Sequence, residues 1–170
     1  MSQGAGHRHG SAALPDLVRP MLAVPGDLPA GDGWGFEHKW DGMRCVAYVA
    51  GDRVRLRSRT DRDVTAGFPE LAPLAEAVAP HRAVLDGEIV ALDPGGRPSF
   101  GLLQPRLGLG DPARAARLAA RAPVAYLLFD LLHLDGTSTM DRPCQERRRL
   151  LLGAKARLRE QLKDHRLPDS

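Results

Sequence analysis

Hydrophobic and polar residues alternate across residues 45–59 in a way that is typical of two paired β-strands. The segment CVAYVA leads into Gly51-Asp52, and RVRLRSR follows, in which Val54 and Leu56 alternate with arginines. A period of two places every second side chain on the same face of a sheet, and Gly-Asp is a common turn pair. The pattern therefore predicts a β-hairpin.

Helical spacing appears first in FPELAPLAEAVA. Its large apolar residues recur every three or four positions, at Phe68, Leu71, Leu74 and Val78, and Pro80 follows as a stop signal. This spacing predicts one helix from about residue 68 to 79.

Two further helices are expected nearer the C-terminus. Residues 111–121 open with Asp111, a suitable N-cap, and Pro112, which is favoured at the first helical position. From about Pro143 onwards an arginine-rich segment has an apolar side formed by Leu150, Leu151 and Leu158. Both segments are predicted to be helical.

Two apolar runs complete the pattern. AVLDGEIVALD, followed by Pro94, Gly95 and Gly96, predicts a second hairpin. YLLFDLLHLDG is almost continuously apolar and ends in Asp135-Gly136, which favours a buried strand with a turn after it, although periodicity alone leaves a helix open. Together these elements predict an α+β fold with antiparallel sheets and flanking helices.

The chain has the size of one ordinary domain. Its 170 residues are 43% hydrophobic, which suffices for a core. We expect residues 1–15 to form a flexible tail and residues 16–170 to form the domain. No segment approaches the roughly 20 apolar residues of a membrane span, and the N-terminus lacks the apolar run of a signal peptide. These features predict a cytoplasmic protein without a membrane partner.

Charge and cysteine content add modest constraints. The formal net charge is +3, with 24 Lys and Arg against 21 Asp and Glu, and most of the positive excess lies in residues 142–170. This distribution permits an anionic partner such as nucleic acid. The two cysteines, Cys45 and Cys144, lie far apart and form no CxxC pattern, so we interpret both as reduced core thiols.

Lys39 is unusual in a chain that fills its cationic positions with arginine. The other two lysines, Lys155 and Lys163, lie near the C-terminus. Arginine stays protonated at accessible pH, whereas an amine that loses its proton becomes a nucleophile. Lys39 is therefore the candidate nucleophile.

The neighbours of Lys39 support chemistry at this position. Asp41, Gly42 and Arg44 complete the pattern K-x-D-G-x-R. Glycine lets the backbone pass close to a ligand, a carboxylate orients or shares a proton, and arginine clamps phosphate or ribose. The short motif alone is equally compatible with a surface lysine beside a strand, with Trp40 in the core and Asp41 capping a turn.

Several sequence blocks, in order, resemble the nucleotidyltransferase domain of ATP-dependent DNA ligases, in particular bacterial ligases associated with break repair. The blocks are RPMLA (19–23), FEHKWDGMR (36–44), SRTDRDVT (58–65), LDGEIVALD (85–93), FGLLQPRL (100–107), YLLFDLLHLDG (126–136) and RPCQERRRLL (142–151). The resemblance implies an ATP-grasp-like nucleotidyltransferase fold within the α+β class.

The resemblance also implies a reaction in three steps. The lysine amine attacks the α-phosphate of ATP and holds AMP as a phosphoramidate. AMP then passes to the 5′-phosphate of nicked double-stranded DNA, and the 3′-hydroxyl displaces it. Such phosphoryl displacements use a divalent cation, so Mg²⁺ or Mn²⁺ is expected beside ATP. Other DNA break-repair proteins are expected partners.

The roles of individual residues follow from the same resemblance. It makes Lys39 the adenylated residue, Glu37 the contact to the adenine amine, Arg44 a contact near the ribose, Arg59 a phosphate contact of the nucleotide or nick, Glu88 a ribose or metal ligand, and Phe129 the adenine stack. Each has a structural alternative: Phe129 in the core, Glu88 and Arg59 facing water. We interpret Tyr48, Arg106 and His133 as structural.

The sequence departs from the family after the helix that starts near Pro143. A family member continues with an EGLVVK-like strand, a KxK block and an OB-fold domain, and none of these follows in this chain. We therefore expect an incomplete adenylation domain without an OB-fold domain. The alternatives are an RNA ligase or capping nucleotidyltransferase, which share KxDG, and a fragment that binds nucleotide or a partner without catalysis.

Overall fold

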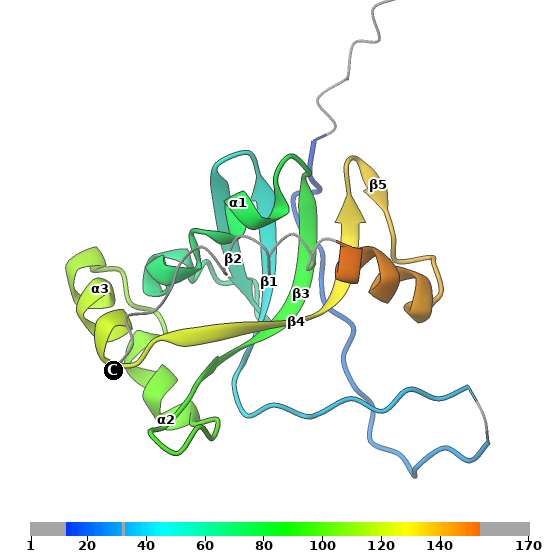
Figure 1. Cartoon of the computed structure of the whole chain (residues 1–170), viewed down its shortest axis with the longest axis horizontal. Helices are drawn as coiled ribbons and strands as arrows, with labels where there is room; N and C mark the ends of the chain where they lie inside the picture. The colour runs from blue at the N-terminus through cyan, green and yellow to red at the C-terminus, as the bar shows by residue number, and fades with distance from the viewer. Residues whose placement is uncertain (1–12, 32, 154–170) are drawn as a thin grey trace, which may run out of the picture.

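A five-stranded antiparallel sheet organises the chain. The computed structural model describes residues 13–31 and 33–153, and its strand order is β2-β1-β3-β4-β5 (Figure 1). The strands are β1 (Met43–Ala50), β2 (Arg53–Ser58), β3 (Ala83–Ala91), β4 (Val124–Leu134) and β5 (Thr137–Ser138). The expected α+β class with an antiparallel sheet is confirmed.

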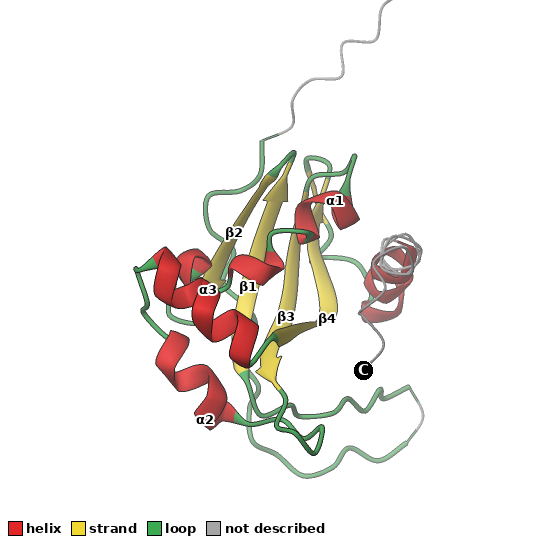
Figure 2. Ribbon diagram, turned by 60° about the vertical axis from the view of Figure 1, so that its left-hand side comes forward, coloured by secondary structure: helices red, strands yellow, loops and turns green. Residues whose placement is uncertain are grey.

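Short helices connect the strands along the chain and lie beside the sheet (Figure 2). They are the 3₁₀ turns η1 (Thr65–Gly67), η2 (Pro69–Leu71) and η3 (Gln104–Arg106), and the α-helices α1 (Leu74–Val78), α2 (Phe100–Leu103) and α3 (Pro112–Arg121). Residues 144–153 form a further helix. None of the helices in the described part of the chain is long and apolar enough to cross a membrane.

Alternation along the strands gives the sheet two different faces. Cys45, Ala47 and Val49 of β1 join the main core, which also includes residues of α1 and α2 and Leu151 of the last helix. Val46 and Tyr48 point to the other face, where they form a smaller cluster with Val18, Val84 and Leu132. The N-terminal segment thus packs on this second face, where the Tyr48 hydroxyl accepts a hydrogen bond from the Val18 amide at 2.7 Å.

Three sequence predictions match the observed elements. β1 and β2 form the expected hairpin, in which Ala50 pairs with Arg53 and Gly51 adopts a positive φ of 61°. The run YLLFDLLHLDG is a strand, part of β4, rather than a helix. At α3, Asp111 Oδ1 accepts a hydrogen bond from the Ala113 amide at 2.9 Å, as an N-cap does.

The helix predicted over residues 68–79 is largely wrong. The segment forms η2 and then only the five-residue helix α1. Pro73 explains the interruption, because an interior proline lacks an amide hydrogen and its ring clashes with the carbonyl of the residue four positions earlier. The apolar spacing was correct nonetheless, since Phe68, Leu74 and Val78 are buried in the main core.

The second predicted hairpin is also wrong. Residues 83–91 form one nine-residue strand, β3, which pairs with β1 on one side and β4 on the other. After the turn, only the isolated bridge between Leu92 and Pro98 returns toward it. A central strand is buried on both faces, so its sequence lacks the clean alternation that separates a hairpin arm from an internal strand.

The two cysteines differ from each other. Cys45 is a buried free thiol, as predicted, and burial raises its pKa to about 12. Cys144 is exposed, so its assignment to the core is wrong. Residues 1–12 of the predicted tail at 1–15 lie outside the described residues. The end of the last predicted helix, with Lys155 and Lys163, also lies outside them.

Candidate active site

Charged side chains gather on the second face of the sheet, at the end where β1 begins and β3 finishes. Arg44 of β1 pairs in register with Glu88 of β3, and Asp86 lies two positions along β3 on the same face. Asp86 has only 2% exposure, and Glu88 is half-buried. The structural alternative for Glu88, a side chain that simply faces water, therefore holds only in part, because Glu88 is half-buried.

Arg44 is held by two sets of contacts. Its Nε donates to Asp86 Oδ1 at 3.2 Å and its Nη2 to Asp86 Oδ2 at 2.7 Å. Its Nη1 donates to the Met21 carbonyl at 2.7 Å, which ties the N-terminal segment to the sheet. The hydrogen bond to Asp86 raises the pKa of Arg44, while burial raises the pKa of the Asp86 carboxyl. Since both carboxylate oxygens accept from the guanidinium, the geometry is that of an ion pair.

Glu88 is the titratable group next to the Lys39 segment. Burial raises its pKa, and the carboxylates of Asp86 and Asp41 raise it further, whereas the positive charges of Arg44 and Lys39 lower it. The Lys39 side chain is exposed, in the segment that leads into β1, and its charge acts on Glu88. The structure thus brings Lys39, Arg44 and Glu88 into one electrostatic neighbourhood.

Gly42 allows this neighbourhood to form. A Cβ atom at this position would lie 2.4 Å from the Ile89 carbonyl oxygen and 2.9 Å from Glu88 Cγ. The glycine of the K-x-D-G pattern is therefore required because the backbone passes directly against β3, which brings the segment containing Lys39 to the end of the strand that carries Glu88.

Phe129 lies beside the Arg44 guanidinium. Arg44 Cζ is 5.4 Å from the centroid of the Phe129 ring, a cation–π distance. In the β3–β4 ladder Asp86 pairs with Asp130 and Gly87 with Leu128, so Phe129 is the extra residue of a bulge. Bulges redirect side chains and are frequent beside active sites. Phe129 is only half-buried, unlike a typical core phenylalanine.

The last helix contacts both the sheet and the Lys39 segment. Arg147 donates from Nε to Asp130 Oδ1 and from Nη2 to Asp130 Oδ2, both at 2.8 Å. The next residue, Arg148, forms an exposed ion pair with Glu37. Glu37, the predicted adenine contact, thus has an arginine partner in this structure.

Arg59 is exposed in the turn that follows β2. It comes directly after Ser58, whose partner in β1 is Cys45, the neighbour of Arg44. Trp40 is 37% exposed and lies 4.8 Å from the His38 ring, centroid to centroid, so it does not fill the core. Arg106, interpreted as structural, is buried and donates to both carboxylate oxygens of Glu70 at 2.6 Å.

Sequence reasoning missed Asp86, Asp130 and Arg147 as parts of the site. Asp86 carried a usable signal, because alternation places it on the face of Glu88 and an aspartate within an apolar strand needs a partner. Asp130 and Arg147 are 17 residues apart and meet only through the turn after β4. No local pattern indicated that contact.

A metal ion would have to be held partly by the nucleotide. Among the described residues, no group of three or more His, Cys, Asp and Glu side chains is arranged to hold a metal. Mg²⁺ is commonly bound by one or two carboxylates together with substrate phosphates. Glu88, half-buried beside two cationic residues, suits that arrangement and not an all-protein site.

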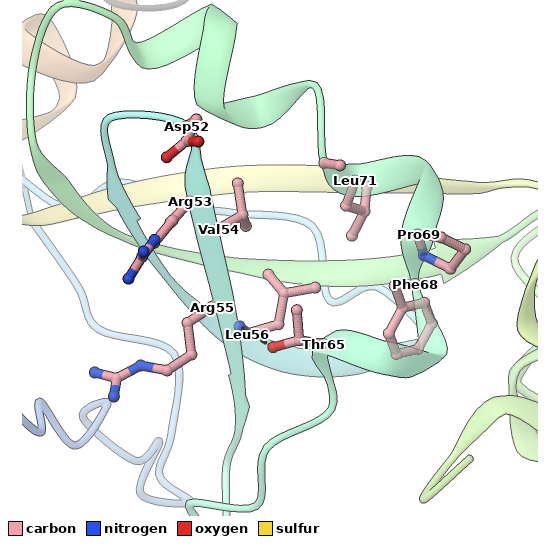
Figure 3. Close-up of a pocket in the computed structure, with 10 residues that line it drawn as sticks. Asp52, Arg53, Val54, Arg55, Leu56, Thr65, Phe68, Pro69 and Leu71 are labelled. Carbon is pink, nitrogen blue, oxygen red and sulfur yellow. Dashed lines mark hydrogen bonds between the residues drawn. The ribbon is translucent and has the colours of Figure 1, made fainter. Parts of the chain in front are cut away.

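A cavity on the other side of the sheet is unrelated to this cluster. It has a volume of about 390 Å³ and lies between β2 and residues 65–72. Figure 3 shows Val54, Leu56, Phe68 and Leu71 facing this space, while Arg53 and Arg55 point away from it. It contains none of the predicted site residues, so we do not assign it to the nucleotide.

Known DNA ligases are similar to this chain in sequence. The family model described as ATP dependent DNA ligase domain matches residues 20–164. The multifunctional non-homologous end joining protein LigD of Mycobacterium bovis is 44% identical over 138 residues, which cover 80% of this chain and 17% of that protein. DNA ligase C of Mycobacterium tuberculosis is 39% identical over 140 residues, or 82% of this chain and 37% of that protein.

Solved structures show the same fold. The crystal structure of the ligase domain from M. tuberculosis LigD matches 71% of this chain and 36% of its own, with a TM-score of 0.59 and 42% identity. A mycobacterial DNA ligase D complexed with ATP and MES matches with a TM-score of 0.58 and 42% identity. The chain spans less than two fifths of the length of each of these relatives. It belongs to the ATP-dependent DNA ligase domain family.

Proposed function

We propose that this chain is the adenylation part of a DNA ligase, in which Lys39 takes AMP from ATP and passes it to the 5′-phosphate of nicked duplex DNA. The observation that supports this most strongly is the convergence of Lys39, Arg44, Glu88 and Phe129 at one end of the sheet's second face. Family membership and the ATP complex of a related ligase point to the same chemistry.

The first step is an in-line displacement at the α-phosphate. The unprotonated amine of Lys39 forms a nitrogen–phosphorus bond, the bond between the α-phosphorus and the bridging oxygen breaks, and pyrophosphate leaves with its electrons. The amine releases a proton in the process. Mg²⁺ or Mn²⁺, held by the nucleotide phosphates and Glu88, would neutralise charge on the phosphate oxygens.

The surrounding side chains have distinct proposed roles. Phe129 stacks on the adenine and Glu37 accepts from its amine, which requires Glu37 to leave Arg148. Glu88 contacts the ribose or the metal. Arg44 is fixed by Asp86 and Met21, so it positions Glu88 and Phe129 while its remaining donor capacity meets the ribose. Arg59, exposed after β2, meets a phosphate of the nucleotide or the nick.

The later steps and the biological setting are proposed on the same basis. Nicked double-stranded DNA accepts the AMP, and other break-repair proteins accompany the enzyme in the cytoplasm. The relatives named for non-homologous end joining support a role in DNA repair. An RNA ligase or capping role has no support from the family that the chain matches.

Labelled ATP tests the proposal directly. The purified chain is incubated with ATP carrying a radioactive α-phosphate and Mg²⁺, and the protein is examined for an acid-labile adduct. We expect the label in the wild type and in Lys155→Ala, which removes a different amine, and its loss in Lys39→Ala. Labelling that survives Lys39→Ala would remove Lys39 from the mechanism. No labelling of any variant would favour the non-catalytic alternative.

A further inference from the structure

Three arginines form a row along α3, a helix that carries none of the residues proposed to hold ATP. Arg114, Arg117 and Arg121 are exposed, and Ala115 on the opposite side of the helix is fully buried. At 3.6 residues per turn, the three side chains fall within a sector of about 60°, and they span about 10 Å along the helix axis. The helix therefore presents one narrow cationic stripe to solvent. Figure 1 shows the position of α3 in the fold.

In the described part of the chain, no ion pair compensates this stripe. Among the described residues, none of the ion pairs involves Arg114, Arg117 or Arg121, and the sequence PARAARLAAR contains no carboxylate. The only acid at the helix, Asp111, already accepts the amides of Ala113 and Arg114 as the N-cap.

Two features of the stripe work against the stability of its own helix, while Arg121 in the last turn is favoured by the helix dipole. Arg117 and Arg121 are four residues apart, and like charges at that spacing repel each other. Arg114 stands in the first turn, where the helix dipole disfavours positive charge. Arginines that only kept the surface soluble would serve equally well at dispersed positions or beside acids. A polyanion bound along the stripe would offset both penalties.

We infer that the arginine stripe of α3 binds the phosphate backbone of duplex DNA, as a contact separate from the nucleotide site. Each guanidinium donates to phosphate oxygens and releases condensed counterions from the duplex. The arginine stripe contacts phosphates and not base edges, so it binds duplex DNA without sequence preference. The identity of the polyanion rests on the proposed ligase function, whereas the existence of an anion-binding stripe does not.

The salt dependence of DNA binding tests this inference. Binding of the full chain to a fluorescent, intact duplex is measured by anisotropy over a series of NaCl concentrations, for the wild type and for R114Q/R117Q/R121Q. Each phosphate contact contributes about 0.9 to the slope of log affinity against log salt, so the triple variant is expected to lose about 2.7 from the magnitude of that slope. Its thermal midpoint should stay close to that of the wild type, because the relieved repulsion and the lost interaction of Arg121 with the helix dipole oppose each other.

A matched variant, R53Q/R97Q/R149Q, removes three exposed arginines that lie outside the stripe. It should leave the slope within about 1 of the wild-type value. Three outcomes would overturn the inference. They are an equal fall of the salt slope in both triple variants, an unchanged slope in the α3 variant, and no duplex binding by the wild type.

Adenylation of Lys39 is measured on the same samples and should be unaffected in both variants. If adenylation fails in the wild type but the slope responds to the α3 substitutions, the proposed function is wrong and the stripe stands. If adenylation succeeds and the slope does not respond, the stripe is wrong and the proposed function stands.

Discussion

At the scale of single residues, the site is built on carboxylates that are removed from water. Asp86 is fully buried and its charge is met by Arg44, whereas Glu88 is half-buried and shares Arg44 and Lys39 with no bidentate partner of its own. Glu88 is thus the carboxylate with spare capacity for a ligand. An incompletely compensated charge lowers the stability of the folded protein, as is common at functional sites.

The first prediction concerns the pH dependence of that cost. Burial raises the folded-state pKa of Glu88, so the folded protein retains a proton that the unfolded chain has already released. Stability contributed by this group therefore falls as pH rises from the ordinary glutamate pKa through the raised one. Glu88→Gln should be more stable than the wild type at about pH 7.5, by less than about 1 kcal/mol because solvent screens the site, and equal at about pH 3.5.

Urea unfolding at the two pH values measures this difference. Glu76→Gln, which changes an exposed glutamate of α1, serves as the control and should show no such dependence. A Glu88→Gln protein that is less stable than the wild type at neutral pH would contradict the electrostatic interpretation. Adenylation should nevertheless be slowed in this variant, since glutamine carries no charge for the metal or ribose.

The second prediction concerns Gly42, whose missing side chain leaves room for β3. In Gly42→Ala the new methyl group would lie 2.4 Å from the Ile89 carbonyl oxygen and 2.8 Å from Val90 Cγ1, so the backbone must move. We expect a loss of about 1–3 kcal/mol in the free energy of unfolding, together with weaker adenylation. Gly35→Ala is the control, because no atom lies within 4 Å of its added Cβ. Equal stability of the two variants would show that the contact is not restrictive.

At the scale of elements, the helix at residues 144–153 connects the parts of the site. Arg147 fixes it to Asp130 on β4, Arg148 reaches Glu37 in the segment before β1, and Leu151 is buried in the main core. The same helix therefore stabilises the sheet and holds a residue proposed to contact adenine. Under the proposed role of Glu37, its release from Arg148 is part of binding ATP.

The third prediction follows from that competition. Arg148→Ala frees Glu37, so half-maximal adenylation should need less ATP, by up to about fivefold, since an exposed ion pair contributes at most about 1 kcal/mol. Arg149→Ala, an exposed neighbour that forms none of the ion pairs in the described part of the chain, should not change the ATP requirement. Titration of ATP in the labelling assay measures both. A higher ATP requirement in Arg148→Ala would mean that Arg148 helps to bind the nucleotide.

The helices and strands differ in how well they could be predicted from the sequence. The β1–β2 hairpin and α3 were predictable because their signals are local: a turn with Gly51 at positive φ, and Asp111 followed by Pro112. The helix over residues 68–79 failed because apolar spacing outweighed Pro73 in the prediction. β3 was mistaken for a hairpin because its neighbours in the sheet, β1 and β4, are distant in sequence.

At the scale of the whole molecule, the candidate site depends on contacts between distant segments. The sequence indicated Lys39 through the scarcity of lysine and Arg44 through the K-x-D-G-x-R pattern. It indicated Glu88 and Phe129 through ordered blocks that resemble a known family, not through any local rule of folding. It did not indicate the pair of Asp130 and Arg147, nor the reason for Gly42, because both require the sheet to be assembled first.

The whole account depends on one amine in a chain that otherwise prefers arginine. The most direct measurement is to locate AMP on the protein after reaction with ATP and Mg²⁺, by mass spectrometry of proteolytic peptides. The account predicts AMP on Lys39 alone in the wild type, and no adduct in Lys39→Arg, whose guanidinium stays protonated although its charge is retained. AMP found on Lys155, Lys163 or any other residue, or an adduct that persists in Lys39→Arg, would contradict the account.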